Sequence, residues 1–172
     1  MRWIISFSLL TAVLFGCSNG DSSNQSNEEA SSSDSTLVLR GLSQDLTLRV
    51  PKSLPGLDEA SIEYNSSFGQ LEVVLGDGFE LHISEEQLAL RTIKEELLND
   101  MLFTYNFQTE NDSELVYQSI LPDGAPHSYQ FTKARKVGGL SLLIRTASMT
   151  QFNQQQLLRM ESAVSTLSLL DS

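Results

Sequence analysis

The sequence predicts an α+β domain, in which a twisted antiparallel sheet of about six to eight strands is covered by two amphipathic helices. Three observations support this class. Short segments alternate between apolar and polar residues, turns rich in glycine and proline separate these segments, and two longer stretches carry apolar residues at helical spacing. Because strands joined by hairpins form antiparallel sheets, the two helices are expected to pack on the faces of one such sheet.

The first half of the domain is expected to contain four short strands and a helix. The strands are predicted at 46–50, 62–64, 70–75 and 79–83. Pro51 ends the first strand, and Gly76-Asp77-Gly78 forms the turn before the fourth. A helix is predicted over 84–101, because Ser84-Glu85-Glu86-Gln87 has the pattern of a capping box. Its buried stripe should contain Leu90, Ile93, Leu97 and Met101.

The second half repeats this order with four strands and a closing helix. The strands are predicted at 103–107, 115–121, 127–137 and 140–146. Gly138-Gly139 predicts a tight hairpin, because both residues accept a positive φ. A second capping pattern, Ser148-Met149-Thr150-Gln151, predicts the start of the last helix. The buried stripe of this helix should contain Leu157, Met160, Val164 and Leu167.

The first seventeen residues have the pattern of an export signal. Arg2 precedes an apolar run from Trp3 to Phe15, and a small residue, Gly16, precedes Cys17. The run is too short for a membrane-spanning helix, which needs about 20 residues. A buried N-terminal strand or helix that places Cys17 in a core is the alternative. Cys17 is the only cysteine, so an internal disulfide is excluded.

The segment Leu14-Phe15-Gly16-Cys17 resembles the lipobox of bacterial lipoproteins. This resemblance implies that residues 1–16 are a signal peptide and that Cys17 becomes a diacylated N-terminus, with palmitate among its acyl chains. The protein would then be held on a membrane outside the cytoplasm. Ser18 follows the cysteine where aspartate would retain a lipoprotein at the inner membrane. The resemblance therefore implies the outer membrane, on its periplasmic or surface side, if the source is Gram-negative.

Residues 17–36 are expected to form a disordered tether. Eight of the nineteen residues in 18–36 are serine, four are acidic and none is basic or aromatic. Such a segment cannot bury enough apolar surface to offset the entropy of ordering. An export signal in its acidic residues is the alternative reading. Residues 37–172 then form a single domain of ordinary size.

The charge of the domain indicates what it does not bind. Residues 37–172 contain ten basic and eighteen acidic residues, a formal charge of −8. This balance argues against nucleic acid and anionic lipid headgroups, which require clustered cations. The one basic cluster, Lys133-Ala134-Arg135-Lys136, falls on a predicted strand and is expected to be a solvated strand face.

The domain resembles the PsbP/DcrB-like fold, an antiparallel sheet between helices found in photosystem subunits and many bacterial lipoproteins. The resemblance covers about 45–168. The residues that carry it are Leu48-Arg49-Val50-Pro51, the predicted helix at 84–101, Tyr129-Gln130-Phe131 before the diglycine turn, and the closing helix through Met160 and Val164. It implies an accessory or assembly factor that binds other proteins, and it carries over no site residues.

Candidate residues for chemistry are few. His82 and His127 lie on separate predicted strands, and Glu80 is the carboxylate expected to contact His82 on its polar face. Two histidines without further ligands at compatible spacing are more typical of a strand surface than of a metal site. An enzyme would need a cleft that gathers one histidine with carboxylates. Thiol catalysis is excluded because the mature domain has no cysteine.

The remaining acidic residues are expected to have structural roles. Asp77, Glu72 and Glu80 could suggest a calcium site, but the segment around Asp77 lacks the regularly spaced oxygen ligands of a calcium-binding loop. A turn at Gly76-Asp77-Gly78 accounts for Asp77. Glu95-Glu96 is expected on the exposed side of the first helix, and Asp123-Gly124 in a turn. No cofactor or metal is therefore expected. The sequence favours a non-catalytic, membrane-anchored envelope protein that binds a partner protein. The alternative is a protein that binds a small apolar ligand between helix and sheet, and an enzyme is the third hypothesis.

Overall fold

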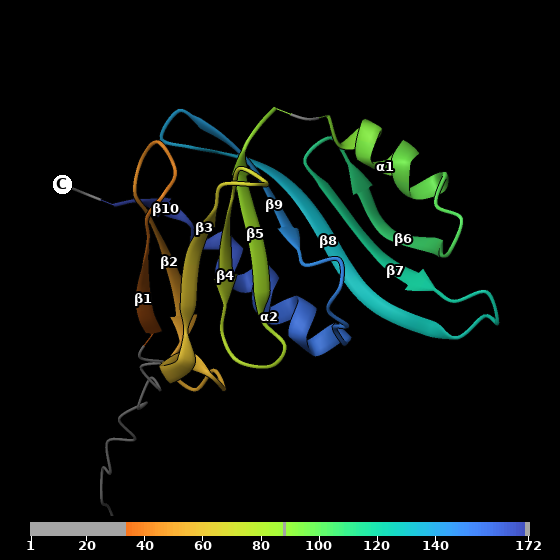
Figure 1. Ribbon diagram of the computed structural model, residues 1–172, viewed down its shortest axis with the longest axis horizontal. Helices are drawn as coiled ribbons and strands as arrows, with labels where there is room; N and C mark the ends of the chain where they lie inside the picture. The colour runs from red at the N-terminus through yellow and green to blue at the C-terminus, as the bar shows by residue number, and fades with distance from the viewer. Residues whose placement is uncertain (1–33, 88, 171–172) are drawn as a thin grey trace, which may run out of the picture. The chain divides into compact units, whose positions relative to one another are not determined.

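The computed structural model describes residues 34–87 and 89–170, which belong to one compact unit. Within these residues it confirms the α+β class, with antiparallel sheets of three and seven strands and two α-helices (Figure 1). The elements are β1 (Asp34–Leu39), β2 (Leu46–Pro51), the short 3₁₀ helix η1 (Leu57–Glu59), β3 (Ser61–Asn65), β4 (Gln70–Val74), β5 (Glu80–Glu85), α1 (Leu90–Leu98), β6 (Thr104–Asn111), β7 (Glu114–Ile120), β8 (Pro126–Val137), β9 (Leu140–Thr146), α2 (Gln154–Ser165) and β10 (Ser168–Leu169). The predicted signal peptide at 1–16, Cys17 and the tether up to residue 33 lie outside the described residues. Neither described helix is long and apolar enough to cross a membrane.

The larger sheet has the strand order β3-β4-β5-β9-β8-β7-β6, and all its neighbouring strands are antiparallel. Each of its seven strands overlaps a strand predicted from the alternation of apolar and polar residues. The predicted diglycine hairpin is also confirmed. Gly138 and Gly139 connect β8 to β9 with φ values of 56° and 94°, which only glycine adopts readily.

The smaller sheet has the order β1-β2-β10 and corrects two expectations. The strand predicted at 46–50 pairs here rather than in the larger sheet. Its partner β1 begins at Asp34, so the last three residues of the predicted tether, 34–36, are strand. The polar residues 34–36 showed no apolar alternation, because the burial of β1 falls on its second half, where Leu39 is fully buried, and backbone pairing with β2 extends the strand back to Asp34.

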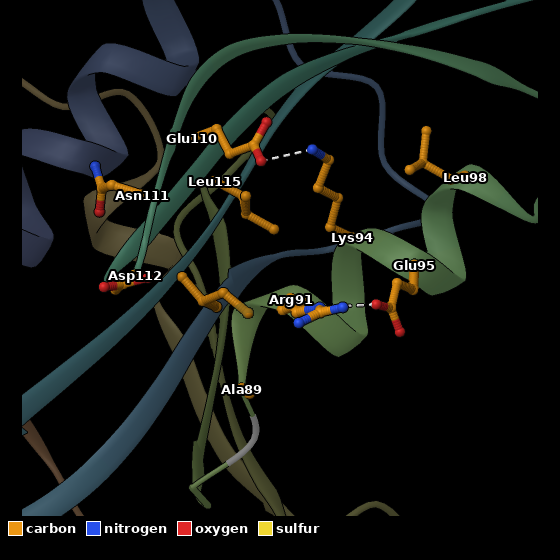
Figure 2. Close-up of a pocket in the computed structure, with 10 residues that line it drawn as sticks. Ala89, Arg91, Lys94, Glu95, Leu98, Glu110, Asn111, Asp112 and Leu115 are labelled. Atoms are coloured by element: carbon orange, nitrogen blue, oxygen red, sulfur yellow. Dashed lines mark hydrogen bonds and ion pairs between the residues drawn. The ribbon is translucent and has the colours of Figure 1, made fainter.

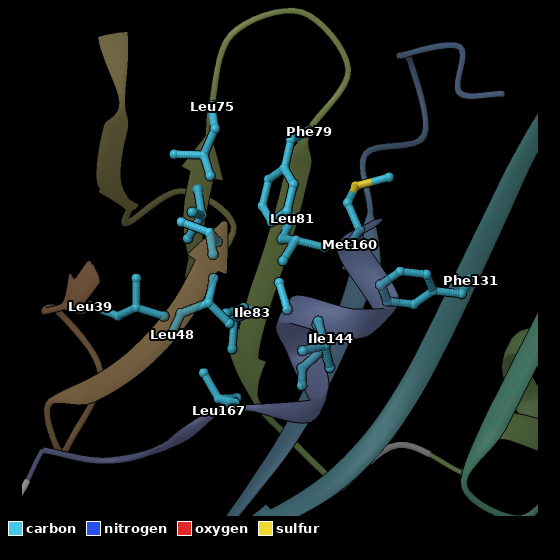
Figure 3. Close-up of a cluster of buried hydrophobic side chains, with 14 of the residues drawn as sticks. Leu39, Leu48, Leu75, Phe79, Leu81, Ile83, Phe131, Ile144, Met160 and Leu167 are labelled. Atoms are coloured by element: carbon cyan, nitrogen blue, oxygen red, sulfur yellow. The ribbon is translucent and has the colours of Figure 1, made fainter. Parts of the chain in front are cut away.

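The main core lies between one face of the larger sheet, α2 and the smaller sheet. Figure 3 shows side chains that converge from these three directions, and we call this side of the larger sheet the α2 face. The fully buried residues labelled there include Leu39, Leu48, Leu81, Ile83, Phe131, Ile144 and Met160. Burying each such side chain contributes about 1.5–3 kcal/mol, so this layer dominates the stability of the fold.

The opposite side of the sheet, which we call the α1 face, has a smaller core. Leu90 and Ile93 of α1 pack against Leu115, Tyr117 and Leu143 of the sheet. Figure 1 shows α1 close to β6 and β7, and the contacts of the helix fall on β6, β7 and β8. The two helices therefore cover opposite faces, as predicted, but α1 covers only one end of its face.

The predicted start and end of α1 are wrong. Ser84 is not a helix cap: it is buried in β5, which continues to Glu85, and it lies opposite Leu143 of β9. Pairing with β9 satisfies the backbone of 84–85 in a ladder, which removes the need for a cap there. The helix begins at Leu90 without a side-chain cap, and Met101, predicted in the buried stripe, follows the helix and is 97% exposed.

The second capping prediction is also wrong in position. The helix α2 begins five residues later than the pattern at 148–151 indicated, and its capping box is formed by Asn153 and Gln156. The side chain of Asn153 accepts the N–H of Gln156 at 3.0 Å, and the side chain of Gln156 accepts the N–H of Asn153 at 2.8 Å. All four predicted stripe residues are buried, although Leu167 follows the end of the helix.

Candidate functional site

A row of polar side chains crosses the α1 face of the larger sheet. Glu72 lies opposite His82, His82 opposite Arg145, and Arg145 opposite Thr132, from β4 through β5 and β9 to β8. Residues directly opposite each other have Cβ atoms about 4.5–5.5 Å apart, so each member can contact the next. Their sequence neighbours point to the main core, and strand alternation therefore directs these four side chains away from it. We call these four residues the polar row.

The polar row lines a hollow of about 560 Å³ beside α1, which we call the central hollow. Its other walls include Tyr117, Gln130, Ile93, Glu96, Leu97, Asp100, Phe68 and Met149. Phe68 and Met149 come from turns and are 74% and 95% exposed. The volume lies in the range of ligand and anchor-residue pockets. The hollow exists because α1 has only nine residues and packs on the far end of this face.

Glu72 carries its negative charge at one end of the row without an ion pair. Its Oε1 accepts hydrogen bonds from Nδ2 of Asn65 at 2.9 Å and from Nε2 of Gln70 at 3.1 Å. The bond from Gln70, followed by that from Asn65, lowers the pKa of Glu72. Both donors are neutral amides, and no ion pair to Glu72 forms among the described residues. The charge is therefore stabilised but not neutralised.

Asp100, at the α1 side of the hollow, is held in the same way. It accepts the hydroxyl of Tyr105 at 2.6 Å and the backbone N–H groups of Leu102 at 2.7 Å and Phe103 at 3.2 Å. The hydrogen bond from Tyr105 is the main cause that lowers the pKa of Asp100. Burial, and then the bond to Asp100, raises the pKa of Tyr105, which keeps the phenol protonated as a donor.

The two basic side chains of the row, His82 and Arg145, already have carboxylate partners. Nε2 of His82 lies 3.3 Å from Oε1 of Glu80, and Oε2 of the same carboxylate accepts the hydroxyl of Thr150 at 2.7 Å. Nη2 of Arg145 lies 3.7 Å from Oε1 of Glu86. Neither carboxylate partner lines the central hollow. The lining itself contains three carboxylates, Glu72, Glu96 and Asp100, against the guanidinium of Arg145, so its formal charge is negative.

A second hollow, of about 710 Å³, lies on the other side of α1 against the β6–β7 hairpin. Figure 2 shows two ion pairs in its lining, one between α1 and β6 and one along α1, and we call it the hairpin hollow. Nζ of Lys94 lies 2.5 Å from Glu110, and Nε of Arg91 lies 3.0 Å from Glu95. Two of its three carboxylates are thus paired with cations and Asp112 is not, whereas none of the three carboxylates of the central hollow has an ion pair.

The structure separates the two predicted histidines. His82 does contact Glu80, as expected, and it lies in a hollow with Glu72. His127 lies at the start of β8, stacks on Phe103 with ring centroids 4.9 Å apart, and contacts Gln151. No group of three or more histidine, cysteine or carboxylate side chains in the described residues could hold a metal ion.

The predicted acidic residues divide between turns and the hollows. Asp77 lies in the β4–β5 turn, and Asp123 accepts the N–H of Ala125 in the turn before β8. Glu95 and Glu96 are both exposed, as predicted; Glu95 is paired with Arg91, and Glu96 lies at the central hollow. Cys17 lies outside the described residues.

The basic cluster at 133–136 is not the solvated strand face that the sequence predicted. Nζ of Lys133 lies 2.5 Å from Glu114 and 3.0 Å from Glu161. Arg135 donates a hydrogen bond to the carbonyl of Val164 in α2. Lys133 and Arg135 therefore point from β8 onto α2, where they hold the helix to the sheet.

Sequence reasoning missed several residues of the central hollow, namely Arg145, Thr132, Tyr117, Phe68 and Met149. Tyr117 is a buried part of the hollow wall, and burial raises its pKa against smaller opposite effects of Thr132 and Arg145. Strand alternation indicates which face each residue occupies. Only the register of β5 with β9 and of β9 with β8 places Arg145 between His82 and Thr132.

Comparisons with protein-family models, with curated proteins and with solved structures gave no match. The resemblance to the PsbP/DcrB-like fold stays a prediction from the sequence.

Proposed function

We propose that this chain is a non-catalytic envelope lipoprotein that binds another envelope protein through the α1 face of its larger sheet. In this proposal the segment at 1–16 is removed, Cys17 is lipidated, and the polar residues before β1 form the tether. The lipobox-like segment Leu14-Phe15-Gly16-Cys17 supports the anchor. Two or more acyl chains on Cys17 would hold the protein stably on the membrane.

The central hollow is the observation that carries the binding part of the proposal. It combines a polar floor with Phe68 and Met149 exposed at its margin. Large aromatic and methionine side chains at a concave surface are typical of protein interfaces, where they become buried anchors. Flexible methionines also adapt to different partner surfaces. A partner segment that entered the hollow would remove both side chains from water.

A small apolar ligand between helix and sheet was the alternative prediction. The charged residues of both hollows favour a polar or charged partner instead, because burying an uncompensated carboxylate under an apolar molecule is costly.

The anchor is tested by metabolic labelling with a palmitate analogue. The chain should incorporate the label, and Cys17→Ala should abolish incorporation. Label in the Cys17→Ala variant would show that the lipid is attached elsewhere and would contradict the lipobox interpretation.

Partner binding is tested by site-specific photo-crosslinking in the native cell. A photoreactive residue at Phe68 or Met149 should give the same discrete crosslinked protein. Leu158 provides the control, because it is also a large exposed apolar residue but lies on α2, the helix of the other face. Adducts of equal intensity and identity from Leu158, or none from the two hollow positions, would contradict the proposal.

The contact between His82 and Glu80 supports a second candidate, an acid–base enzyme. A histidine oriented by a carboxylate in a hollow is a common arrangement of a general base. However, no serine or threonine hydroxyl of the described residues is hydrogen-bonded to His82, so the arrangement supplies no activated nucleophile. Hydrolysis of chromogenic esters by the full chain that is lost in His82→Gln would favour this candidate.

A further inference from the structure

We propose that the central hollow binds a basic segment of the partner protein, in which an apolar side chain stands next to a lysine or arginine. This inference rests on the proposed function and specifies the chemistry of the partner at the same surface. It depends on three features of the described residues: the uncompensated charge of the hollow, its contrast with the hairpin hollow, and the exposed apolar groups at its margin.

The net charge of the central hollow is negative, and its carboxylates have no ion pairs. Glu72, Glu96 and Asp100 line it, and none of the three forms an ion pair with another described residue. The hydrogen-bond donors that hold Glu72 and Asp100 are amides, a phenol and backbone N–H groups, which fix the position of each carboxylate without cancelling its charge. A cationic side chain is the complementary group.

The hairpin hollow shows that this pattern is not general to the acidic surface of the domain. There, two of the three carboxylates, Glu110 and Glu95, are matched by Lys94 and Arg91. The basic side chains that line the central hollow, His82 and Arg145, instead contact Glu80 and Glu86, which lie outside its lining. The central hollow therefore presents three carboxylates without an ion pair, whereas the hairpin hollow presents one, Asp112.

The apolar requirement comes from the margin of the hollow. Phe68 and Met149 line it and are 74% and 95% exposed. An apolar side chain of the partner would gain contact with these groups. A lysine or arginine could also stack on the ring of Phe68, since cations bind aromatic faces. The occupant is thus basic and apolar rather than only basic.

A lipid surface is the competing occupant for exposed apolar side chains. The carboxylates of the hollow disfavour a lipid surface. Anionic headgroups would be repelled by them, and in zwitterionic headgroups the positive group is already accompanied by the phosphate of the same lipid. We therefore assign the hollow to a protein segment, and the experiment below distinguishes the two.

The first experiment identifies what lies in the hollow in the cell. The full chain with a photoreactive residue at Phe68 is crosslinked, and mass spectrometry locates the adduct. An adduct on a partner segment with lysine or arginine beside an apolar residue is the expected result. An adduct on an acidic or uncharged segment would overturn this inference and leave the proposed function standing. A phospholipid adduct would overturn it in favour of a membrane, and absence of any adduct from Phe68 and Met149 would reject the proposed function itself.

The second experiment measures the charge dependence with a defined probe. A fluorescent twelve-residue peptide of repeating Ser-Lys-Leu is titrated with the full lipidated chain in neutral detergent, and a Ser-Glu-Leu peptide serves as the negative probe. Glu72→Gln with Glu96→Gln should weaken binding of the basic peptide by about 3- to 10-fold, the range for two partly exposed charges. Asp58→Asn with Glu59→Gln removes the same net charge from exposed residues of neither hollow and should leave the dissociation constant nearly unchanged. Equal weakening of peptide binding in both double variants would show that binding depends only on the net charge of the chain, and would overturn the assignment of the basic segment to the central hollow.

Discussion

Tyr105 donates a hydrogen bond of 2.6 Å from its hydroxyl to Oδ2 of Asp100, and thereby joins β6 to the turn that follows α1. The other oxygen of the carboxylate accepts two backbone N–H groups of the same turn. The pair combines a carboxyl group whose pKa is lowered with a phenol whose pKa is raised. At neutral pH Asp100 is therefore charged and Tyr105 protonated, which keeps this corner of the central hollow negative.

The folded state should lose stability when the solution is acidified. The pKa values of Asp100 and Glu72 are lower in the folded chain than their usual values of 3.8 and 4.5. Between the usual and the lowered values the unfolded chain binds more protons, so the free energy of unfolding rises with pH and falls on acidification. Urea unfolding at pH 7 and at about pH 3 should show this loss.

The variant Tyr105→Phe tests the cause of that pH dependence. It removes the main hydrogen bond that lowers the pKa of Asp100, so the acid-induced loss of stability should become smaller. Tyr64→Phe, on an exposed tyrosine of β3, is the matched control and should keep the dependence of the original chain. An unchanged acid-induced loss in Tyr105→Phe would show that Asp100 does not contribute to it.

Replacement of Asn153, the N-cap of α2, should lower the free energy of unfolding more than replacement of Ser148, the predicted cap. In Asn153→Ala the helix loses the acceptor for the N–H of Gln156, and the free energy of unfolding should fall by about 1 kcal/mol. Ser148 is exposed and lies five residues before the cap, so Ser148→Ala should change stability by less than about 0.5 kcal/mol. Chemical denaturation of both variants checks this, and the opposite ranking would place the helix start at 148–151 after all.

Two glycines in separate turns approach each other so closely that neither tolerates a side chain. A Cβ atom on Gly56 would lie 2.3 Å from Cα of Gly76, and both residues have positive φ. Gly56→Ala should therefore destabilise the fold by more than the roughly 1–2 kcal/mol of left-handed strain alone. Gly124 also has a positive φ, but a Cβ there meets nothing within 4 Å, so Gly124→Ala isolates the strain. Equal losses in thermal unfolding would show that the two turns can move apart.

Most of the strands could be predicted from the sequence because they bury one face, although no residue of β3 or β6 is more than partly buried. Alternation in segments such as 79–83 reports that burial directly, and the seven strands of the larger sheet were found in this way. Residues 34–36 of β1 gave no such signal, since their place in the strand depends on pairing with β2. The capping patterns misplaced the starts of both helices. Ser84 pairs with β9 in the sheet instead of capping α1, and Asn153, not Ser148, is the N-cap of α2.

The candidate site could be predicted only in part. The contact of Glu80 with His82 follows from their spacing on one strand, and it was found. Arg145 joins them through the pairing of β5 with β9, which connects segments on either side of α1 and three further strands. Local periodicity does not encode such long-range pairing. The exposed Phe68 and Met149 were missed for a related reason, since a turn residue shows no periodicity that places it beside a hollow.

The helix α1 should open more readily than α2. It buries two residues and has no side-chain cap, whereas α2 buries four and has a capping box. Hydrogen exchange should therefore be faster for the amides of Leu90–Leu98 than for those of Gln154–Ser165, because local opening follows the number of buried contacts.

The variant Ala89→Ser tests whether the missing cap is part of this difference. Ala89 is exposed, occupies the N-cap position of α1 and has an extended backbone there, so a serine hydroxyl could accept an N–H of the first turn. We expect exchange within α1 to slow by a factor of about 2–5, the equivalent of roughly 0.5–1 kcal/mol, without change in α2. If α1 were held mainly by its packing on Leu115 and Tyr117, the exchange rates in Ala89→Ser would remain as in the original chain. Exchange in α1 would then be slowed by a ligand that fills the central hollow and contacts Ile93 and Leu97, and not by a cap.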